Sequence, residues 1–245
     1  MSSDVSKELS ENILAAKAAR RPLRIRGGGT KDFYGNEPRG ELLDTRGYAG
    51  IVDYEPTELV ITARGGTRLV DLEEKLAAQN QYLPFEPPHF GADATLGGCI
   101  AAGLSGPRRA SAGALRDFVL GARIIDGAGR ELGFGGRVMK NVAGYDISRL
   151  LAGSLGTLGL ILEVSLKVLP RPRAELTLRL ELPEGRALES LNRWAGQPLP
   201  VSASAWRDGE LSLRLSGADA ALQAAAERIG GERVEIGRAS CRERV

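Results

Sequence analysis

Apolar residues recur at helical spacing in two places near the start of the chain. The first stripe, which includes Leu9 and Ile13, predicts an N-terminal helix over residues 6–20. The second stripe predicts a helix over residues 67–79, with Thr67 as its N-terminal cap. Short apolar runs separated by turn residues predict strands at 23–26, 42–44, 51–54 and 59–63. This opening part of the chain is therefore expected to form a small α/β unit.

The middle of the chain has a different pattern. Residues 85–113 hold too much glycine and proline for a continuous helix or strand, yet they are more apolar than an ordinary surface loop. Residues 118–126 and 131–134 predict a hairpin, and a loop is expected at 138–144. A short helix at 147–151 and a buried aliphatic strand at 158–169 follow.

After Pro172 the alternation of strands and helices becomes regular. The predicted order is β-α-β-β-α-β, which is the ferredoxin-like split motif. We therefore divide the chain into a first domain over residues 1–172 and a second, complete or truncated, over 173–237. Residues 238–245 continue neither pattern, and we set them apart as a tail that need not belong to the natural protein.

Composition excludes several classes of protein. The net charge of +2 gives no broad basic face for nucleic acid. Two cysteines and one histidine, His89, argue against a zinc or haem site built by this chain, so no metal is expected. The N-terminus lacks the apolar core of a signal peptide, and no apolar run is long enough to cross a bilayer. We expect a cytoplasmic protein, which a partner could hold at the membrane surface.

Glycine is unusually common, and it gathers in apolar stretches. The chain has 32 glycines in 245 residues, about 13% against an average near 7%. The first cluster, Gly27 to Gly29 followed by Thr30, exposes successive backbone amides that suit an anion such as phosphate. Neither the P-loop pattern nor a glycine fingerprint that opens a helix is present. A glycine-rich turn without a ligand remains the alternative at this point.

Two further clusters change the balance. Residues 94–103, ATLGGCIAAG, offer small side chains where a ligand or a neighbouring backbone could pass closely. Residues 153–159, GSLGTLG, lead into the predicted buried strand. Tight packing alone would explain either cluster, but three such clusters in one chain favour a shared ligand.

These residues resemble a known family. RGGGT, ATLGGCIAAG, GALRDFVLG and the run from Lys140 to Pro170 are similar to the FAD-binding domain of the vanillyl-alcohol oxidase and p-cresol methylhydroxylase type. GLSGPRR and KNVAGYD resemble most the FAD-binding subunits of bacterial glycolate oxidases. The resemblance covers residues 8–172 and implies an α+β fold: a two-subdomain FAD-binding domain of this type followed by a ferredoxin-like cap domain.

The resemblance also implies which residues bind FAD. The first cluster would hold the diphosphate through main-chain amides, the second would pass along the diphosphate and the ring system, and the strand after the third would contact the adenine side. The implied cofactor-binding residues are Arg26, Gly27, Gly28, Gly29, Thr30, Thr95, Leu96, Gly97, Gly98, Ala101, Gly103, Gly113, Asp117, Gly156, Gly159 and Ile161. Some family members carry a histidine, which attaches the flavin covalently, where this chain has Thr30. Non-covalent FAD is therefore expected, and Cys99 is better explained as a small buried core residue than as a thioether link.

The activity that the resemblance implies is oxidation of glycolate, a 2-hydroxy acid, to glyoxylate. His89 is a candidate base, and Arg109, beside Arg108, is a candidate for the substrate carboxylate; a packing histidine and a solvated basic pair are the alternatives. The implied partners are a larger flavin subunit and an iron–sulfur subunit, which would receive the electrons at the inner membrane. Two other possibilities stay open: a stand-alone D-2-hydroxy-acid dehydrogenase or NADPH-dependent reductase of the same fold, and a non-catalytic assembly subunit.

Overall fold

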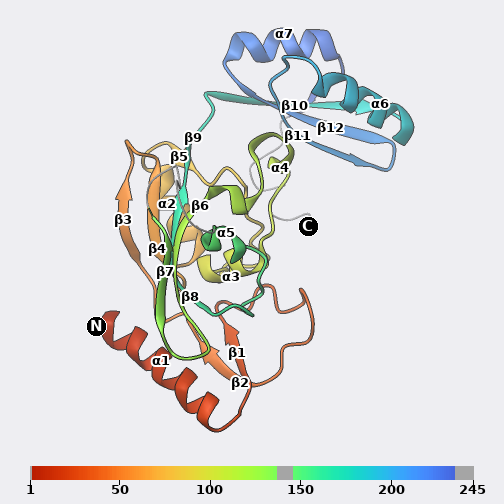
Figure 1. Ribbon diagram of the computed structural model, residues 1–245. Helices are drawn as coiled ribbons and strands as arrows, with labels where there is room; N and C mark the ends of the chain where they lie inside the picture. The colour runs from red at the N-terminus through yellow and green to blue at the C-terminus, as the bar shows by residue number, and fades with distance from the viewer. Residues whose placement is uncertain (1, 137–145, 235–245) are drawn as a thin grey trace. The chain divides into compact units, whose positions relative to one another are not determined.

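The computed structural model describes residues 2–136 and 146–234 (Figure 1). The chain forms two compact units. The first comprises the chain up to Leu83, then Pro87–Leu104 and Ala114–Pro170. The second comprises Pro84–Glu86, Ser105–Gly113 and the chain from Arg171 onward. Two short segments from the middle of the sequence therefore belong to the second unit, which the linear division at residue 172 does not anticipate.

A five-stranded sheet forms the centre of the first unit, in the order β3-β4-β8-β6-β7 with every neighbouring pair antiparallel. Its strands are β3 (Ile51–Glu55), β4 (Val60–Arg64), β8 (Leu160–Lys167), β6 (Val119–Ile125) and β7 (Glu131–Gly135). Almost all of β8 is buried, including Glu163, which accepts from the Tyr48 hydroxyl at 2.9 Å, and Ser165, which lies 2.8 Å from the Thr62 hydroxyl. The predicted hairpin and the predicted buried strand are confirmed, and only their ends differ.

Two shorter pairings complete the strands of the first unit. β1 (Leu23–Arg26) pairs in parallel with β2 (Glu41–Asp44). β5 (Gln81–Tyr82) pairs with β9 (Leu169–Pro170). β1 ends at Arg26, and the first glycine cluster follows directly.

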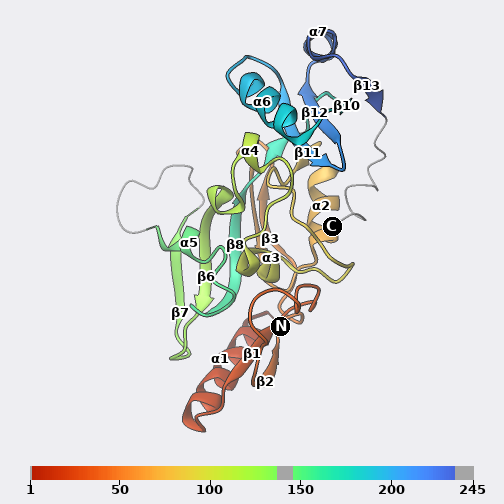
Figure 2. The ribbon, with the colours of Figure 1, turned by 90° about the vertical axis from the view of Figure 1, so that its right-hand side faces the viewer.

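The helices of the first unit cover these strands (Figures 1 and 2). α1 (Ser2–Ala18) lies along β1 and β2, and its Leu9 and Ile13 enter a buried cluster with Leu162 of β8. The others are α2 (Leu69–Ala77), α3 (Leu96–Ala102), the 3₁₀ turn η1 (Leu115–Phe118) and α5 (Ile147–Leu150). α3 packs against β4 and β8, which fixes the second glycine cluster on the central strands.

The cap predicted for α2 is wrong. The helix begins at Leu69 with Arg68 as its N-cap, and no side chain caps it. Thr67 instead accepts a hydrogen bond from the Gly50 amide at 2.9 Å and donates to the Gly50 carbonyl at 3.2 Å. The hydroxyl ties the β4–α2 connection to the start of β3, a long-range contact that local spacing does not reveal.

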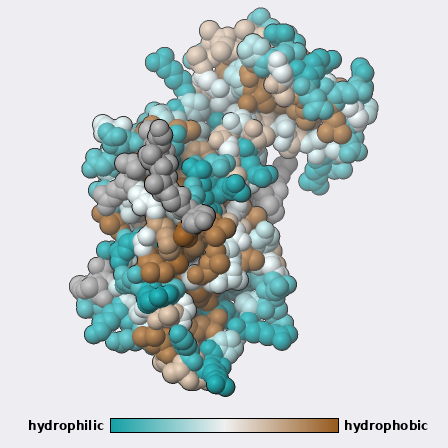
Figure 3. Space-filling model, viewed as in Figure 1, coloured by the Kyte–Doolittle hydropathy of each residue, from teal (hydrophilic) through white to brown (hydrophobic). Residues whose placement is uncertain are grey.

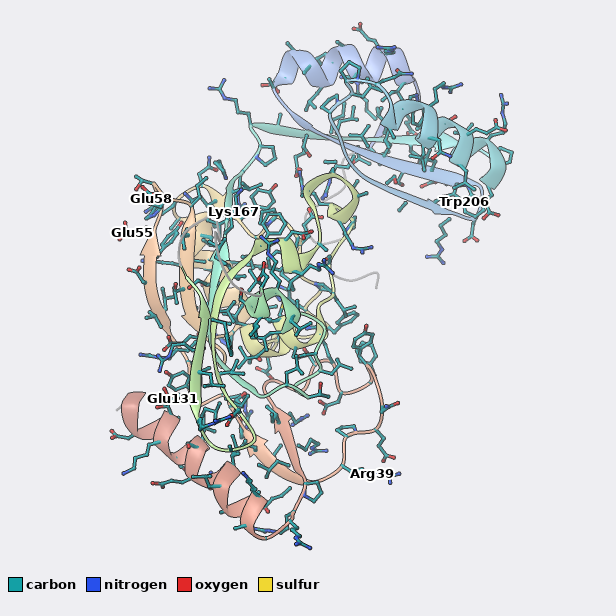
Figure 4. The ribbon with its side chains drawn as sticks, in the orientation of Figure 1. Arg39, Glu55, Glu58, Glu131, Lys167 and Trp206 are labelled. Atoms are coloured by element: carbon teal, nitrogen blue, oxygen red, sulfur yellow. The ribbon has the colours of Figure 1, made fainter. Side chains whose placement is uncertain are left out.

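The second unit has the predicted β-α-β-β-α-β order. Its elements are β10 (Ala174–Glu181), α6 (Glu184–Ala195), β11 (Val201–Arg207), β12 (Glu210–Gly217), α7 (Asp219–Ile229) and β13 (Glu232–Val234), with α4 (Arg109–Ala112) from the earlier segment. The sheet order is β11-β12-β10-β13. Leu178, Leu211 and Leu213 form its core with Trp194 of α6 and Leu222 of α7. Trp206, labelled in Figure 4, donates from its indole N–H to the Leu182 carbonyl at 2.8 Å.

Two of the sequence predictions lie entirely outside the described residues. These are the loop at 138–144 and the tail at 238–245. In residues 2–136 and 146–234, no helix has the length and apolar character that crossing a membrane requires.

Candidate functional site

The first glycine cluster is pressed against the chain that precedes α3. A Cβ on Gly27 would overlap the Thr95 hydroxyl, and a Cβ on Gly28 would overlap the Asp93 carbonyl oxygen. A side chain at Gly28 would have to displace a backbone carbonyl, which cannot rotate away, and one at Gly27 would disturb the Thr95 hydroxyl that caps α3. Glycine is therefore needed here to let the first and second clusters approach each other.

The same cluster presents a run of unpaired amides. The N–H groups of Gly27, Gly28, Gly29 and Thr30 donate no hydrogen bond to any residue that the structure describes, and all four residues are half-buried. Buried backbone donors are normally paired. Arg26 braces the turn, since its Nε donates to Asp32 Oδ2 at 2.8 Å. Consecutive unpaired amides in a braced turn form a cradle that suits an anionic group.

The second cluster forms a short helix of small residues. Thr95 is the N-cap of α3, and its hydroxyl accepts from the Gly98 amide at 3.3 Å. The Leu96 amide donates to the Thr67 carbonyl at 2.8 Å, and the Gly97 amide donates to the Gly65 carbonyl at 2.7 Å. These bonds fix the start of α3 against the β4–α2 connection. The predicted residues Thr95, Leu96, Gly97 and Gly98 thus belong to one rigid element.

The third cluster lies beside the second. The Gly153 amide donates to the Ile100 carbonyl at 3.0 Å, and the Leu155 amide donates to the Ala101 carbonyl at 2.9 Å. Gly103 ends α3 in the left-handed conformation, and a Cβ there would lie 2.7 Å from the Gly153 nitrogen. The close packing of α3 on residues 153–155 explains why small residues follow one another in both clusters.

The third cluster also approaches the first. A Cβ on Gly156 would lie 3.7 Å from Ile25 Cδ1 of β1, directly before the first cluster. Gly159 is packed against the Ile125 carbonyl at the entry to β8, in which Ile161 pairs with Ile124. The structure therefore brings the three glycine clusters together, although more than 120 residues separate the first from the third.

One polar atom at this site has no partner. The Ser154 hydroxyl is buried and makes no hydrogen bond within residues 2–136 and 146–234. A buried hydroxyl without a partner costs free energy, so such atoms mark places where a ligand or water completes the bonding. Sequence reasoning missed Ser154, because a serine between two glycines looks like any turn residue.

Lys31 is a second residue that sequence reasoning missed. It follows the first cluster directly, and its Nζ lies 3.5 Å from the His89 carbonyl oxygen and 5.6 Å from the centre of the Phe90 ring. Burial lowers the pKa of Lys31 below its ordinary value. A half-buried cation next to the amide cradle adds to the attraction for an anion.

Cys99 lies inside α3 and is almost inaccessible. Its exposed fraction is 1%, and burial raises the pKa of its thiol to about 12. Because the thiolate is the nucleophile, Cys99 is unsuited to covalent attachment of a cofactor. This agrees with its interpretation as a core residue.

A chemical test of Cys99 follows from these properties. Iodoacetamide at about pH 8 should leave Cys99 unmodified in the folded protein, because almost none of the thiol is ionised or accessible there. The same reagent in strong guanidinium should modify it fully. Peptide mass spectrometry measures both results, and rapid labelling of Cys99 in the folded protein would contradict the buried environment.

The remaining predicted residues lie outside the three glycine clusters. His89 Nε2 lies 3.0 Å from Glu73 Oε1 of α2, and its side chain is 15% exposed. Asp117 accepts from the Ala114 amide at 2.9 Å at the start of η1. Arg109 begins α4 and Gly113 ends it, both within the second unit. None of the described contacts joins Asp117 to the glycine clusters, and the described residues contain no group of three potential metal ligands.

A pocket opens beside the second cluster. It has a volume of about 600 Å³, and Thr95 is the one predicted cofactor-binding residue in its wall. Arg46 and Arg68 also line it, but Asp44 holds Arg46 at 2.6 Å and Asp71 holds Arg68 at 2.6 Å. The unpaired amides of the first cluster do not line this pocket. The pocket therefore lies beside the turn at residues 27–30 and is a separate feature.

Apolar side chains are exposed next to the third cluster. Figure 3 shows apolar residues gathered on the face of the first unit where α5 and α3 lie. Leu150 is 62% exposed, and Leu155 and Leu158 are also exposed. Contiguous apolar surface of this kind is typical of sites that contact another molecule.

Comparison with known proteins gives the following matches. The family model described as "FAD binding domain" matches residues 5–135. The glycolate oxidase subunit GlcE of Escherichia coli strain K12 is 52% identical over 231 residues, which cover 94% of this chain and 66% of that protein. A D-lactate dehydrogenase of Archaeoglobus fulgidus is 33% identical over 181 residues, which cover 73% of this chain and 40% of that protein.

A solved structure shares the fold. An alkyldihydroxyacetonephosphate synthase superimposes with a TM-score of 0.73 and 18% identity, over 97% of this chain and 55% of that one. At this identity the likeness concerns the fold alone. The chain thus spans between two fifths and two thirds of the length of the relatives and the structure compared here.

Proposed function

This chain belongs to the FAD binding domain family, and we propose that it is the FAD-binding subunit of a glycolate oxidase, which oxidises glycolate to glyoxylate. The observation that carries the proposal is that three glycine clusters pack against one another, and that the first of them presents four unpaired amides. The 52% identity to the E. coli glycolate oxidase subunit supports the choice of substrate.

The described residues fit a non-covalently held FAD. The amides of Gly27 to Thr30 would hold the diphosphate, with Lys31 as the nearby cation and the Ser154 hydroxyl as a further donor. Thr30 offers a hydroxyl where the covalent members of the family have an imidazole, and Cys99 is buried as a neutral thiol. The remaining predicted residues of the second and third clusters would line the same site through their main chain.

When bound, FAD supplies the acceptor for the hydride that leaves the hydroxyl-bearing carbon. The chain itself must then accept the hydroxyl proton and hold the carboxylate. His89, with its Nε2 held by Glu73, is our candidate for the proton, and Arg109 is our candidate for the carboxylate. Gly113 and Asp117 stay proposed members of the cofactor site.

The proposal includes the domain organisation and the partners. We assign residues 1–172 to a two-subdomain FAD-binding domain and 173–237 to a ferredoxin-like cap, with residues 84–86 and 105–113 of the first packed in the second unit. With two cysteines, this chain cannot build an iron–sulfur cluster of four thiolates, so electrons would pass to a larger flavin subunit and an iron–sulfur subunit. The exposed leucines of residues 147–158 offer surface for such a partner, which would hold the complex at the inner membrane.

A second candidate function is a D-2-hydroxy-acid dehydrogenase that works without partners. The similarity to the A. fulgidus D-lactate dehydrogenase over 73% of this chain favours it. The two functions differ in whether the purified chain alone can be reduced by its substrate.

One set of spectra distinguishes the two functions. After FAD is added and unbound FAD is removed by gel filtration, the purified chain should retain the visible absorbance of flavin, and anaerobic glycolate should bleach it only after partner subunits are supplied. Rapid bleaching by D-lactate or glycolate alone would favour the stand-alone enzyme. A chain that binds no FAD at any concentration would contradict the proposal.

Ser154→Ala tests the unpaired hydroxyl. We expect FAD affinity to fall about three- to tenfold, the value of one hydrogen bond. The apo protein should be no less stable, because the variant removes a buried group that has no partner. FAD fluorescence titration and thermal melting measure the two effects.

Ser10→Ala is the matched control. Its hydroxyl donates to the Gly129 carbonyl at 2.7 Å, so the variant should lower stability and leave FAD affinity unchanged. Equal FAD affinity in Ser154→Ala and the wild type would show that the Ser154 hydroxyl does not contact FAD.

A further inference from the structure

A charge network in the second unit joins the chain on the two sides of residues 87–104, which carry the second glycine cluster. Glu86 lies directly before this segment, and Arg108 lies just beyond its end. The Arg108 amide donates to Glu86 Oε2 at 3.0 Å, and Arg108 Nε donates to Glu86 Oε1 at 3.3 Å. The Gly106 amide also donates to the Phe85 carbonyl at 2.8 Å. The ends of the segment are therefore clamped together.

The clamp is fastened to the sheet of the second unit. Arg214 of β12 donates from Nη2 to Glu86 Oε2 at 2.9 Å. Arg108 pairs with Glu175 of β10, and its Nη2 donates to the Ser216 hydroxyl at 3.2 Å. The network therefore joins three parts of the sequence: Glu86, Arg108, and the strands β10 and β12.

Burial makes this network sensitive to the loss of one charge. Arg108 is 7% exposed, and the side chain of Glu86 is 23% exposed. Removing one member of a buried ion pair leaves the other without compensation, which is far more costly than breaking a surface pair. Glu86 is the member that faces two guanidinium groups, Arg108 and Arg214.

We propose that Glu86, with Arg108 and Arg214, is a positioning residue for the cofactor site, because it holds together the two ends of the segment that carries the second glycine cluster. By holding the two ends of residues 87–104 together, the network limits how far this segment can open, and so supports the bonds that fix Leu96 and Gly97 to the β4–α2 connection. The ligand in this inference is FAD, and to that extent it rests on the proposed function. The contacts of the network given above involve no predicted cofactor-binding residue, so the influence proposed here acts through the chain between its two ends.

Glu86→Gln tests the coupling, with Glu232→Gln as the matched control. Glu232 belongs to the same unit and pairs with Arg179 at 2.6 Å, but its side chain is 66% exposed. We expect Glu86→Gln to weaken FAD binding about tenfold and to speed hydrogen exchange in residues 94–103 of the apo protein. Glu232→Gln should change neither.

The two readouts separate this inference from the proposed function. If the wild type binds no FAD, the proposed function fails, while exchange in the apo protein still decides the coupling. Should Glu86→Gln fail to fold, Arg214→Lys keeps the charge but replaces the guanidinium, and smaller changes of the same sign are expected. A folded Glu86→Gln with wild-type exchange in residues 94–103 and wild-type FAD affinity would overturn the inference.

Discussion

Gly28→Ala should abolish useful FAD binding, with a loss of affinity of about a hundredfold or more. A Cβ at this position would overlap the Asp93 carbonyl oxygen, and its backbone neighbour has no alternative rotamer. The first cluster would have to move away from the chain before α3. The N–H groups of Gly27 to Thr30 would then no longer point toward one bound anion. Fluorescence titration with FAD measures the loss.

Gly127→Ala is the control for this result. Gly127 lies in the turn between β6 and β7, and a Cβ there would meet no atom within 4 Å. The control should bind FAD like the wild type. Near-normal affinity of a folded Gly28→Ala would show that the close approach of the first two clusters is not needed for the cofactor.

Gly103→Ala should lower the free energy of unfolding by about 2–4 kcal/mol, as the sum of two costs. The residue has φ of 67°, a conformation that costs an alanine about 1 kcal/mol or more. Its Cβ would also lie 2.7 Å from the Gly153 nitrogen, whose hydrogen bond to the Ile100 carbonyl would be strained. Denaturant unfolding measures the change.

Gly153→Ala separates the two costs. Gly153 has φ of 83°, but a Cβ there would meet nothing within 4 Å. Its loss of stability should therefore be about 1 kcal/mol, from the backbone alone. Equal losses in the two variants would mean that α3 and the third cluster are not packed as closely as the structure has them.

Much of the fold could be predicted because its signals are local. The run at 158–169 begins with aliphatic residues at strand length, and it forms the buried centre of the sheet although Glu163 and Ser165 alternate with apolar residues in it. The glycine clusters were recognisable because a missing Cβ is visible in the sequence itself. Their meeting in space rested on the family resemblance, and the contacts of Gly27, Gly28 and Gly103 now describe it.

The features that sequence reasoning missed depend on distant partners. Thr67 bonds to Gly50 rather than capping α2, and Glu86 pairs with Arg214 across 128 residues. Neither partner can be inferred from spacing, because ion pairs and hydroxyl bonds between separate elements leave no periodic pattern. For the same reason the segments 84–86 and 105–113 looked like part of the first domain, although Glu86 pairs with Arg214 and Arg108 pairs with Glu175 of the second unit.

The most direct test of the account is the footprint of FAD on backbone hydrogen exchange of the purified chain. Saturating FAD should slow exchange in residues 27–31, 94–103 and 153–161 together, because the three glycine clusters form one site. Protection confined to residues 46–51 and 66–71, around the neighbouring pocket, would contradict it. So would an exchange pattern that FAD leaves unchanged.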